Sequence, residues 1–184
     1  MFFNSYTSSQ SKKRDLIDSF YYKIVNVSRS KDFYEKLLVP DTIDGRYDLL
    51  VLFSIILTFH LSKCGNLGKE LSQNLFDKIF LDLDLSLREL GAGDAGVHIK
   101  IKQMINSYMG RQQAYCNCLK AKDFDKLEKH ITKNVYRNVV DFGKSPYLLS
   151  KYCQKVFFLF ENKNDQYFLL NEFNFPKFEY QFKQ

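Results

Sequence analysis

The sequence predicts an all-α protein that folds as a single-domain helical bundle. Apolar residues recur at three- and four-residue intervals along most of the chain, which is the spacing of amphipathic helices. One run, from Leu49 to Phe59, is apolar on nearly every side and indicates a central helix that other helices surround. The 184 residues, 45% of them hydrophobic, suffice for one core and are too few to predict two full-sized domains.

The first half of the chain carries the signals of three helices. Apolar spacing predicts helices over residues 15–28, 33–38 and 44–63. Pro40 ends the second of them, because the residue before a proline is disfavoured in the helical region.

The first 14 residues differ in charge from the rest of the chain. Lys12, Lys13 and Arg14 occur there without an acidic residue, and we expect residues 1–14 to form a flexible basic N-terminus. The helical domain is then expected to span residues 15–184.

The segment from residue 67 to residue 90 carries two conflicting signals. Residues 81–87 alternate leucine with polar residues, as strands do. A longer stripe at helical spacing runs through the same segment: Leu75, Phe76, Ile79, Phe80, Leu83, Leu87 and Leu90. Because the longer register outweighs the shorter one, we predict a helix.

The second half of the chain continues the helical pattern. Helices are predicted over residues 95–120, 123–136 and 145–160. Ser145 is expected to be the N-cap of the last helix, with Pro146 at its first position. Residues 165–184 are aromatic and partly alternating, which predicts an irregular aromatic C-terminal tail.

Composition argues against several kinds of site. The four cysteines lack the spacing of zinc sites and are expected to stay reduced, and the three histidines have no acidic partner at metal-site spacing. The longest apolar run is far shorter than the roughly 20 residues needed to cross a bilayer. We therefore expect no metal, no cofactor and no membrane span. The formal charge of +6 suits RNA, anionic lipid or an acidic partner.

A glycine-rich segment from Gly91 to Gly96 matches the dinucleotide-binding pattern G-x-G-x-x-G. That fingerprint also needs a βαβ unit and an acidic residue about 20 positions later. The stretch from Tyr108 to Lys122 contains no acid. We interpret the segment as a glycine turn with Asp94 as the N-cap of the next helix, and we keep a nucleotide-dependent enzyme as the third hypothesis.

Two arginines occur where the helical phase predicts core. Arg111 shares a face with the apolar residues around it, and Arg46 begins the central helix, so both are predicted to face inward. A buried guanidinium needs carboxylates, and the nearby motifs offer Asp41, Asp44, Glu89 and Asp94. We favour a structural ion network over a direct binding role. Gly110 costs about 1 kcal/mol relative to Ala inside a helix, which indicates that another backbone packs close to it.

Several separate segments agree in order and spacing with one known family. They are Val39 to Leu50, Arg88 to Asp94, Gly110 to Tyr115 and Asn134 to Tyr136. In these segments the chain resembles the ubiquinol–cytochrome c chaperone family, and the resemblance covers roughly residues 20–140. A weaker match at Phe175-Pro176 extends the resemblance. The family motif then forms a polar network with a structural or client-binding role: Asp41, Asp44, Gly45, Arg46, Arg88, Glu89, Gly91, Gly93, Asp94, Gly110, Arg111, Tyr115 and Asn134.

This resemblance implies an assembly chaperone, and not an enzyme, for the cytochrome bc1 complex. Such a protein binds newly made cytochrome b near the ribosome or the membrane, together with a small partner protein, and has no DNA partner. The chain resembles the shorter alphaproteobacterial members. That implies a cytoplasmic location with peripheral contact at the inner face of the inner membrane, or the mitochondrial matrix in a eukaryote.

Two surfaces are candidates for these contacts. A basic face that suits ribosomal RNA or anionic headgroups would consist of Lys100, Lys102, Lys120 and Lys122. The alternative hypothesis is accordingly a basic helical ribosome- or RNA-binding module without a cytochrome client. An exposed apolar patch could come from aromatic residues near the C-terminus, although core closure is the favoured role for most: Phe157, Phe158, Phe160, Tyr167, Phe168, Phe173, Phe175 and Phe178.

Overall fold

The computed structural model describes residues 3–91, 93–137 and 139–179, and every regular element in these ranges is a helix. The helices are α1 (Phe3–Ser28), α2 (Lys31–Glu35), α3 (Ile43–Leu61), α4 (Gly65–Glu89), α5 (Asp94–Ala121), α6 (Phe124–Val135), α7 (Ser145–Glu161) and α8 (Asp165–Leu169). The predicted all-α class is confirmed.

Helix α3 is the centre of the bundle. It packs against α1, α4, α5, α6 and α7, and its residues from Tyr47 to Leu61 are all buried. A helix covered on every side needs apolar residues on every side, which explains the run from Leu49 to Leu57, where Ser54 is the one polar residue and bonds to the carbonyl of Val51. The prediction of a central helix is confirmed.

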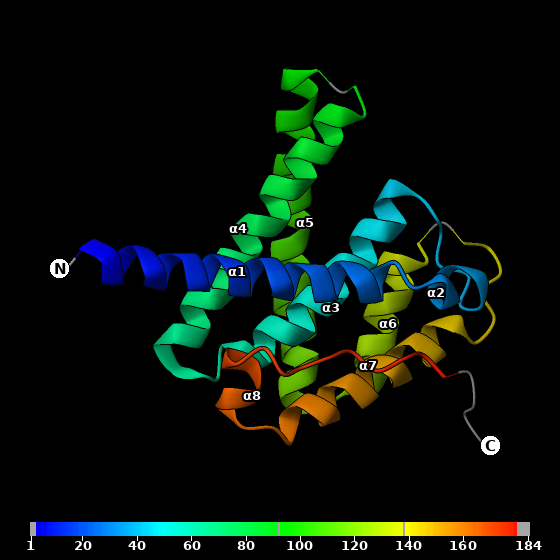
Figure 1. Ribbon diagram of the computed structural model, residues 1–184. Coiled ribbons are helices and arrows are strands. Elements are labelled where there is room, and N and C mark those ends of the chain that lie inside the picture. The colour runs from blue at the N-terminus through cyan, green and yellow to red at the C-terminus, as the bar shows by residue number, and fades with distance from the viewer. Residues whose placement is uncertain (1–2, 92, 138, 180–184) are drawn as a thin grey trace.

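Helices α4 and α5 form a long antiparallel pair. Their inner halves pack against the bundle, where Phe76 and Phe80 meet Tyr108 with ring centroids 5.1 and 5.7 Å apart. Their outer ends project beyond the other helices (Figure 1), and we call residues 81–103 the arm. At its tip Gly91 has φ +86°, a conformation that favours glycine. The helical prediction for residues 67–90 is confirmed, although the leucines alternate.

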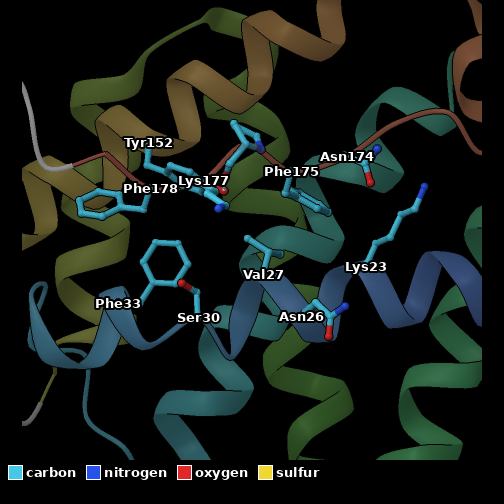
Figure 2. Close-up of a pocket in the computed structure, with 11 residues that line it drawn as sticks. Lys23, Asn26, Val27, Ser30, Phe33, Tyr152, Asn174, Phe175, Lys177 and Phe178 are labelled. Carbon is cyan, nitrogen blue, oxygen red and sulfur yellow. Dashed lines mark hydrogen bonds between the residues drawn. The ribbon is translucent and has the colours of Figure 1, made fainter.

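The C-terminal segment runs between α1 and α7 and is bonded to both (Figure 1). Lys23 Nζ donates to the carbonyl of Phe173 at 2.6 Å, and Tyr152 Oη donates to the carbonyl of Pro176 at 2.7 Å. A cavity of about 260 Å³ remains between this segment and α1, where Phe33 and Phe178 face each other (Figure 2).

Most of the aromatic residues near the C-terminus are part of the core, which is the role that the sequence favoured for them. The buried ones are Phe157, Phe160, Phe168, Phe173 and Phe178. Tyr167 and Phe175 are half-buried, whereas Phe158 is exposed. The tail after α8 has no regular structure through residue 179, in line with the prediction for that part.

One predicted helix start and two predicted N-caps were wrong. Helix α1 begins at Phe3 and not at Asp15, so residues 3–14, expected to form a flexible N-terminus, continue the helix. Gly93 is the N-cap of α5, because the Asp94 carboxylate is bound to Arg88 and not to the helix backbone. Lys144 precedes α7 as its cap, since the Ser145 N–H already closes a turn with Phe142.

Two glycines of the family motif have opposite surroundings. A Cβ on Gly45 would lie 2.0 Å from the carbonyl oxygen of Pro40, so only glycine fits there. A Cβ on Gly110 would meet no heavy atom within 4 Å. The prediction that a backbone packs against Gly110 was wrong, because this residue lies on the exposed side of α5.

These surroundings predict opposite effects of alanine. Gly45→Ala should destabilise the fold through backbone overlap with Pro40, whereas Gly110→Ala should raise the free energy of unfolding by about 1 kcal/mol through helix propensity. Urea denaturation of both variants measures the difference. A Gly45→Ala protein as stable as the wild type would show that the loop before α3 can move aside.

His60 is buried near the end of α3 among aromatic rings. Its ring lies 5.0 Å from Phe157 and stacks on Phe168. Its Nδ1 is 3.7 Å from Glu161 Oε2, and among the described residues Nε2 has no hydrogen-bond partner. Burial lowers the pKa of His60 to about 4, and the charge of Lys63 acts in the same direction, so the imidazole is neutral at neutral pH.

A buried neutral histidine makes stability depend on pH. Because the folded pKa lies below the ordinary value of 6.5, the unfolded chain takes up the proton first as pH falls. The contribution of neutral His60 to the free energy of unfolding is fully present above pH 6.5. Between pH 6.5 and about pH 4 the free energy of unfolding falls by about 3 kcal/mol, because only the unfolded chain binds the proton there. We expect His60→Phe to flatten the urea stability profile over this interval. His130→Phe, at a half-buried site, is the control, and identical slopes in His60→Phe and wild type would contradict the prediction.

Candidate functional site

A buried ion pair joins α3 to α5. Arg111 Nη2 lies 2.7 Å from Asp48 Oδ1, and the two side chains are 7% and 2% exposed. Arg137, just after α6, lies 3.1 Å from the other Asp48 oxygen, Oδ2. The prediction that Arg111 faces inward is confirmed. The sequence did not single out its partner Asp48, which lies within the central apolar helix one turn after Asp44.

Hydrogen bonds that involve uncharged side chains extend this pair along α5. Arg111 Nη1 donates to Ser107 Oγ at 2.6 Å, and Tyr47 Oη donates to the carbonyl of Met104 at 2.6 Å. The hydroxyls of Tyr47 and Ser107 are 3.0 Å apart. Since each of these groups is buried or half-buried, the network fixes the register of α3 against α5.

The electrostatics of Asp48 reflect two opposing effects. Burial raises the pKa of Asp48 to about 6, whereas the charges of Arg111 and Arg137 lower it. At neutral pH the carboxylate is therefore ionised and paired. Removing either side of the pair would leave a buried charge uncompensated.

Arg46 does not join this network. Its side chain is 59% exposed, and its Nε donates to Asp41 Oδ1 at 2.6 Å on the surface. The prediction that Arg46 faces inward was wrong. Its neighbours Gly45 and Tyr47 are buried, and the core side of this first turn of α3 is already filled by them.

The remaining motif residues form separate groups. At the tip of the arm, Arg88 binds Asp84 and Asp94, while Glu89 is exposed. On the surface near Asp48, Asp44 lies 3.3 Å from Lys100 and 3.6 Å from Arg137. Asn134 Nδ2 donates to Tyr115 Oη at 3.0 Å between α6 and α5. The charged residues of the motif therefore form two separate groups. One is centred on the buried Arg111 and reaches the surface at Asp44, and the other surrounds Arg88 at the tip of the arm.

The predicted basic face is divided. Lys100 and Lys102 lie in the arm, whereas Lys120 and Lys122 lie at the other end of α5, roughly 30 Å away by helical rise. Lys100 pairs with Asp44, and Lys122 lies 3.9 Å from Glu161. These four lysines do not form one continuous surface.

An apolar groove lies where the arm meets the bundle. It has a volume of about 170 Å³ and receives side chains from α1, α3, α4 and α5. We call it the arm groove; its aliphatic lining includes Val25, Ile43, Leu50, Leu83, Leu87 and Leu90. Ile43 and Leu90 are 52% and 69% exposed. The alternating leucines of residues 81–87 were the sequence signal for this surface, because a helix with leucine at every second position cannot bury all of them on one face.

Two further cavities, each with charged residues in its lining, flank the arm groove. One, of about 350 Å³, is lined by Arg29, Lys31, Tyr34, Glu35, Asp41 and Arg46, and we call it the basic cleft. The other, of about 610 Å³, lies over the exposed edge of the Asp48 network, where Asp44, Lys100 and Arg137 meet Leu87. The N-terminus of α3 is thus surrounded by recesses of different polarity.

The described residues offer no support for the other kinds of site. Within them, no three His, Cys, Asp or Glu side chains cluster in a way that could hold a metal ion. None of the described helices combines the length and hydropathy of a bilayer-spanning segment. The glycine-rich turn follows helix α4, so the strand required before a dinucleotide-binding turn is absent there.

The buried pair predicts a large difference between two arginines. Arg111→Ala should lower the free energy of unfolding by about 3–5 kcal/mol, because it strands Asp48 in the core. Arg46→Ala should leave the melting temperature nearly unchanged, because its ion pair is exposed. Thermal and urea denaturation compare the two. If Arg111→Ala kept wild-type stability, the pair would not be structural.

Comparisons with known proteins agree with this arrangement. The model of the ubiquinol-cytochrome C chaperone family matches residues 35–175, which include the α3 motif, the arm and the tail as far as Phe175. A crystal structure of the Cbp3 homolog from Brucella abortus is 26% identical, with a TM-score of 0.84 over 96% of this chain and 97% of that one. A comparison with curated proteins gives no significant match. The chain therefore belongs to the ubiquinol-cytochrome C chaperone family.

Proposed function

We propose that this protein is an assembly chaperone of the cytochrome bc1 complex that binds newly made cytochrome b through the arm groove. Membership of the chaperone family and the likeness to the Cbp3 homolog support the assembly role. The arm groove supports the client contact, since a chaperone for a membrane protein must cover apolar segments before they are packed.

The groove offers aliphatic side chains on a rigid base. Leu50 and Met104 form buried parts of it on α3 and α5, while Leu87 and Leu90 line it from the arm. Burying an aliphatic side chain contributes about 1.5–3 kcal/mol, so two or three anchors supply on the order of 5 kcal/mol. Part of this is lost to the entropy of association, which favours weak and reversible binding. Reversibility suits a protein that must release its client.

The wider setting of this activity follows from the same proposal. Cytochrome b is made at a ribosome and inserted into a membrane, so the chaperone would work near both as a peripheral protein, together with a small partner protein. Lysines at both ends of α5 are available for phosphate contacts, whose contribution would fall with salt. No catalytic step is assigned to the protein.

Deletion of the gene tests the assembly role. We expect loss of spectroscopic cytochrome b and of bc1 activity, with the other respiratory complexes intact. Normal bc1 levels in the deletion strain would contradict the proposal and favour a ribosome- or RNA-binding module without a cytochrome client.

Complementation of the deletion strain tests the groove. Leu90→Glu places a charge in the groove at a side chain that is 69% exposed, so folding should be preserved while bc1 assembly falls. Leu170→Glu is the matched control, because Leu170 is 64% exposed after α8 and lies outside the groove. Both proteins are checked for equal melting temperature and abundance. Equal rescue by the two variants would place the client elsewhere.

A further inference from the structure

The arm groove and the basic cleft are neighbours. Arg29 and Arg46 line both of them, so these two arginines lie between an aliphatic surface on the arm side and a basic surface on the side of α2. Sequence analysis assigned no role to Arg29, which lies directly after the end of α1.

The acidic groups around this junction are mostly engaged. Asp41 accepts from Arg46 Nε at 2.6 Å, and Asp82 accepts from the hydroxyl of Tyr21. In the part of the chain that the structure describes, the side chains of Arg29 and Lys31 make no hydrogen bond or ion pair. Glu35 is the carboxylate of the cleft that is likewise without an ion pair there. In the basic cleft, Arg29 and Lys31 are thus, among the described residues, two cations without an ion pair beside one such carboxylate, Glu35. On the groove side Asp82 keeps its negative charge, because its partner Tyr21 is neutral.

Arg29 is held in place by its backbone and its neighbours. Its N–H donates to the carbonyl of Val25 at 3.0 Å, and Tyr34 Oη donates to the carbonyl of Ser28 at 2.6 Å. These bonds fix the turn between α1 and α2 next to the aliphatic wall. The backbone of Arg29 is therefore fixed beside a surface that favours apolar side chains. Its guanidinium, unpaired within the described part of the chain, is within reach of a carboxylate bound next to that surface, which could pair with it bidentately.

We propose that the arm groove and the basic cleft bind one polypeptide segment, whose apolar side chains enter the groove while an adjacent carboxylate pairs with Arg29. The segment is an apolar stretch flanked by Asp, Glu or a free C-terminus. This inference rests on the proposed function, because the segment belongs to the client that the arm groove is proposed to bind. It adds a charge rule, by which we mean a preference for a negative charge next to the apolar stretch of the bound segment. An aliphatic groove alone would show no such preference.

Synthetic peptides test the charge rule on the full chain. Three fluorescein-labelled peptides share one leucine- and alanine-rich sequence and end in glutamate, glutamine or lysine residues. Fluorescence anisotropy should show the tightest binding for the glutamate peptide and the weakest for the lysine peptide, with the glutamine peptide between them. Each difference in affinity should be about two- to five-fold, as expected for an ion pair at the rim of a site. Added salt should reduce these differences. An equal affinity for all three peptides, or no binding of any, would overturn the inference.

Substitutions test the roles of the basic cleft and of the arm groove separately. Arg29→Glu should reverse the order of the peptides, and Leu90→Ser should weaken all three by about five-fold without changing their order. Lys129→Glu, an exposed substitution in α6 outside both cavities, is the control and should change neither the order of the peptides nor their affinity. An unchanged order in Arg29→Glu would refute the assignment of Arg29. Because the deletion phenotype reads bc1 assembly independently, a failed peptide test would leave the assembly role standing.

Discussion

The ion pair between Asp48 and Arg111 is the constraint on which the arrangement around α3 depends. Both side chains are almost completely buried, so each charge must be compensated by the other. The pair links α3 to α5, and Arg137 connects it to the end of α6. Gly45 lies one turn earlier in α3 and touches Pro40, which fixes the loop that enters the helix. The start of α3 is therefore fixed by two contacts: the buried ion pair of Asp48 with Arg111, and the close approach of Gly45 to the backbone of Pro40.

The ion pair fixes the inner half of α5 to the bundle, and the outer half of this helix forms the arm together with α4. Helix α5 is fixed to the bundle in its inner half, at Tyr108, Arg111 and Tyr115, which are all buried. Its outer half packs mainly with α4, as the projecting pair in Figure 1 shows. A two-helix arm cannot bury leucines that point in several directions, so some of them line a groove where the arm meets α1 and α3. The apolar surface proposed for the client is thus a consequence of the fold's geometry.

The aromatic residues of the C-terminal segment have a different task. They fill the space between α1, α2, α3 and α7, where Phe173 packs on Phe20 and Phe178 on Phe33. Lys23 and Tyr152 bind backbone carbonyls of this segment and hold it in place. Since most of these rings are buried, they are not available as a client surface, and the arm groove is the better candidate. The basic residues near it then add selectivity by charge, since ion pairs at the rim of an interface affect specificity more than total affinity.

The sequence by itself determined the helical class, the central position of α3 and the inward direction of Arg111, because apolar periodicity records which face of each helix is covered. The polar motif was also sufficient to indicate the family. Only the tertiary structure decided that Asp48 is the partner of Arg111, that Arg46 points outward, that Gly110 faces open space and that α1 begins at Phe3. Periodicity cannot supply these results, since the pairing of two charges depends on where helices cross and the crossing is set by contacts far apart in the chain. The same reason applies to the arm groove: Leu83 and Leu87 are visible in the sequence, but the groove that they line is formed by four helices together.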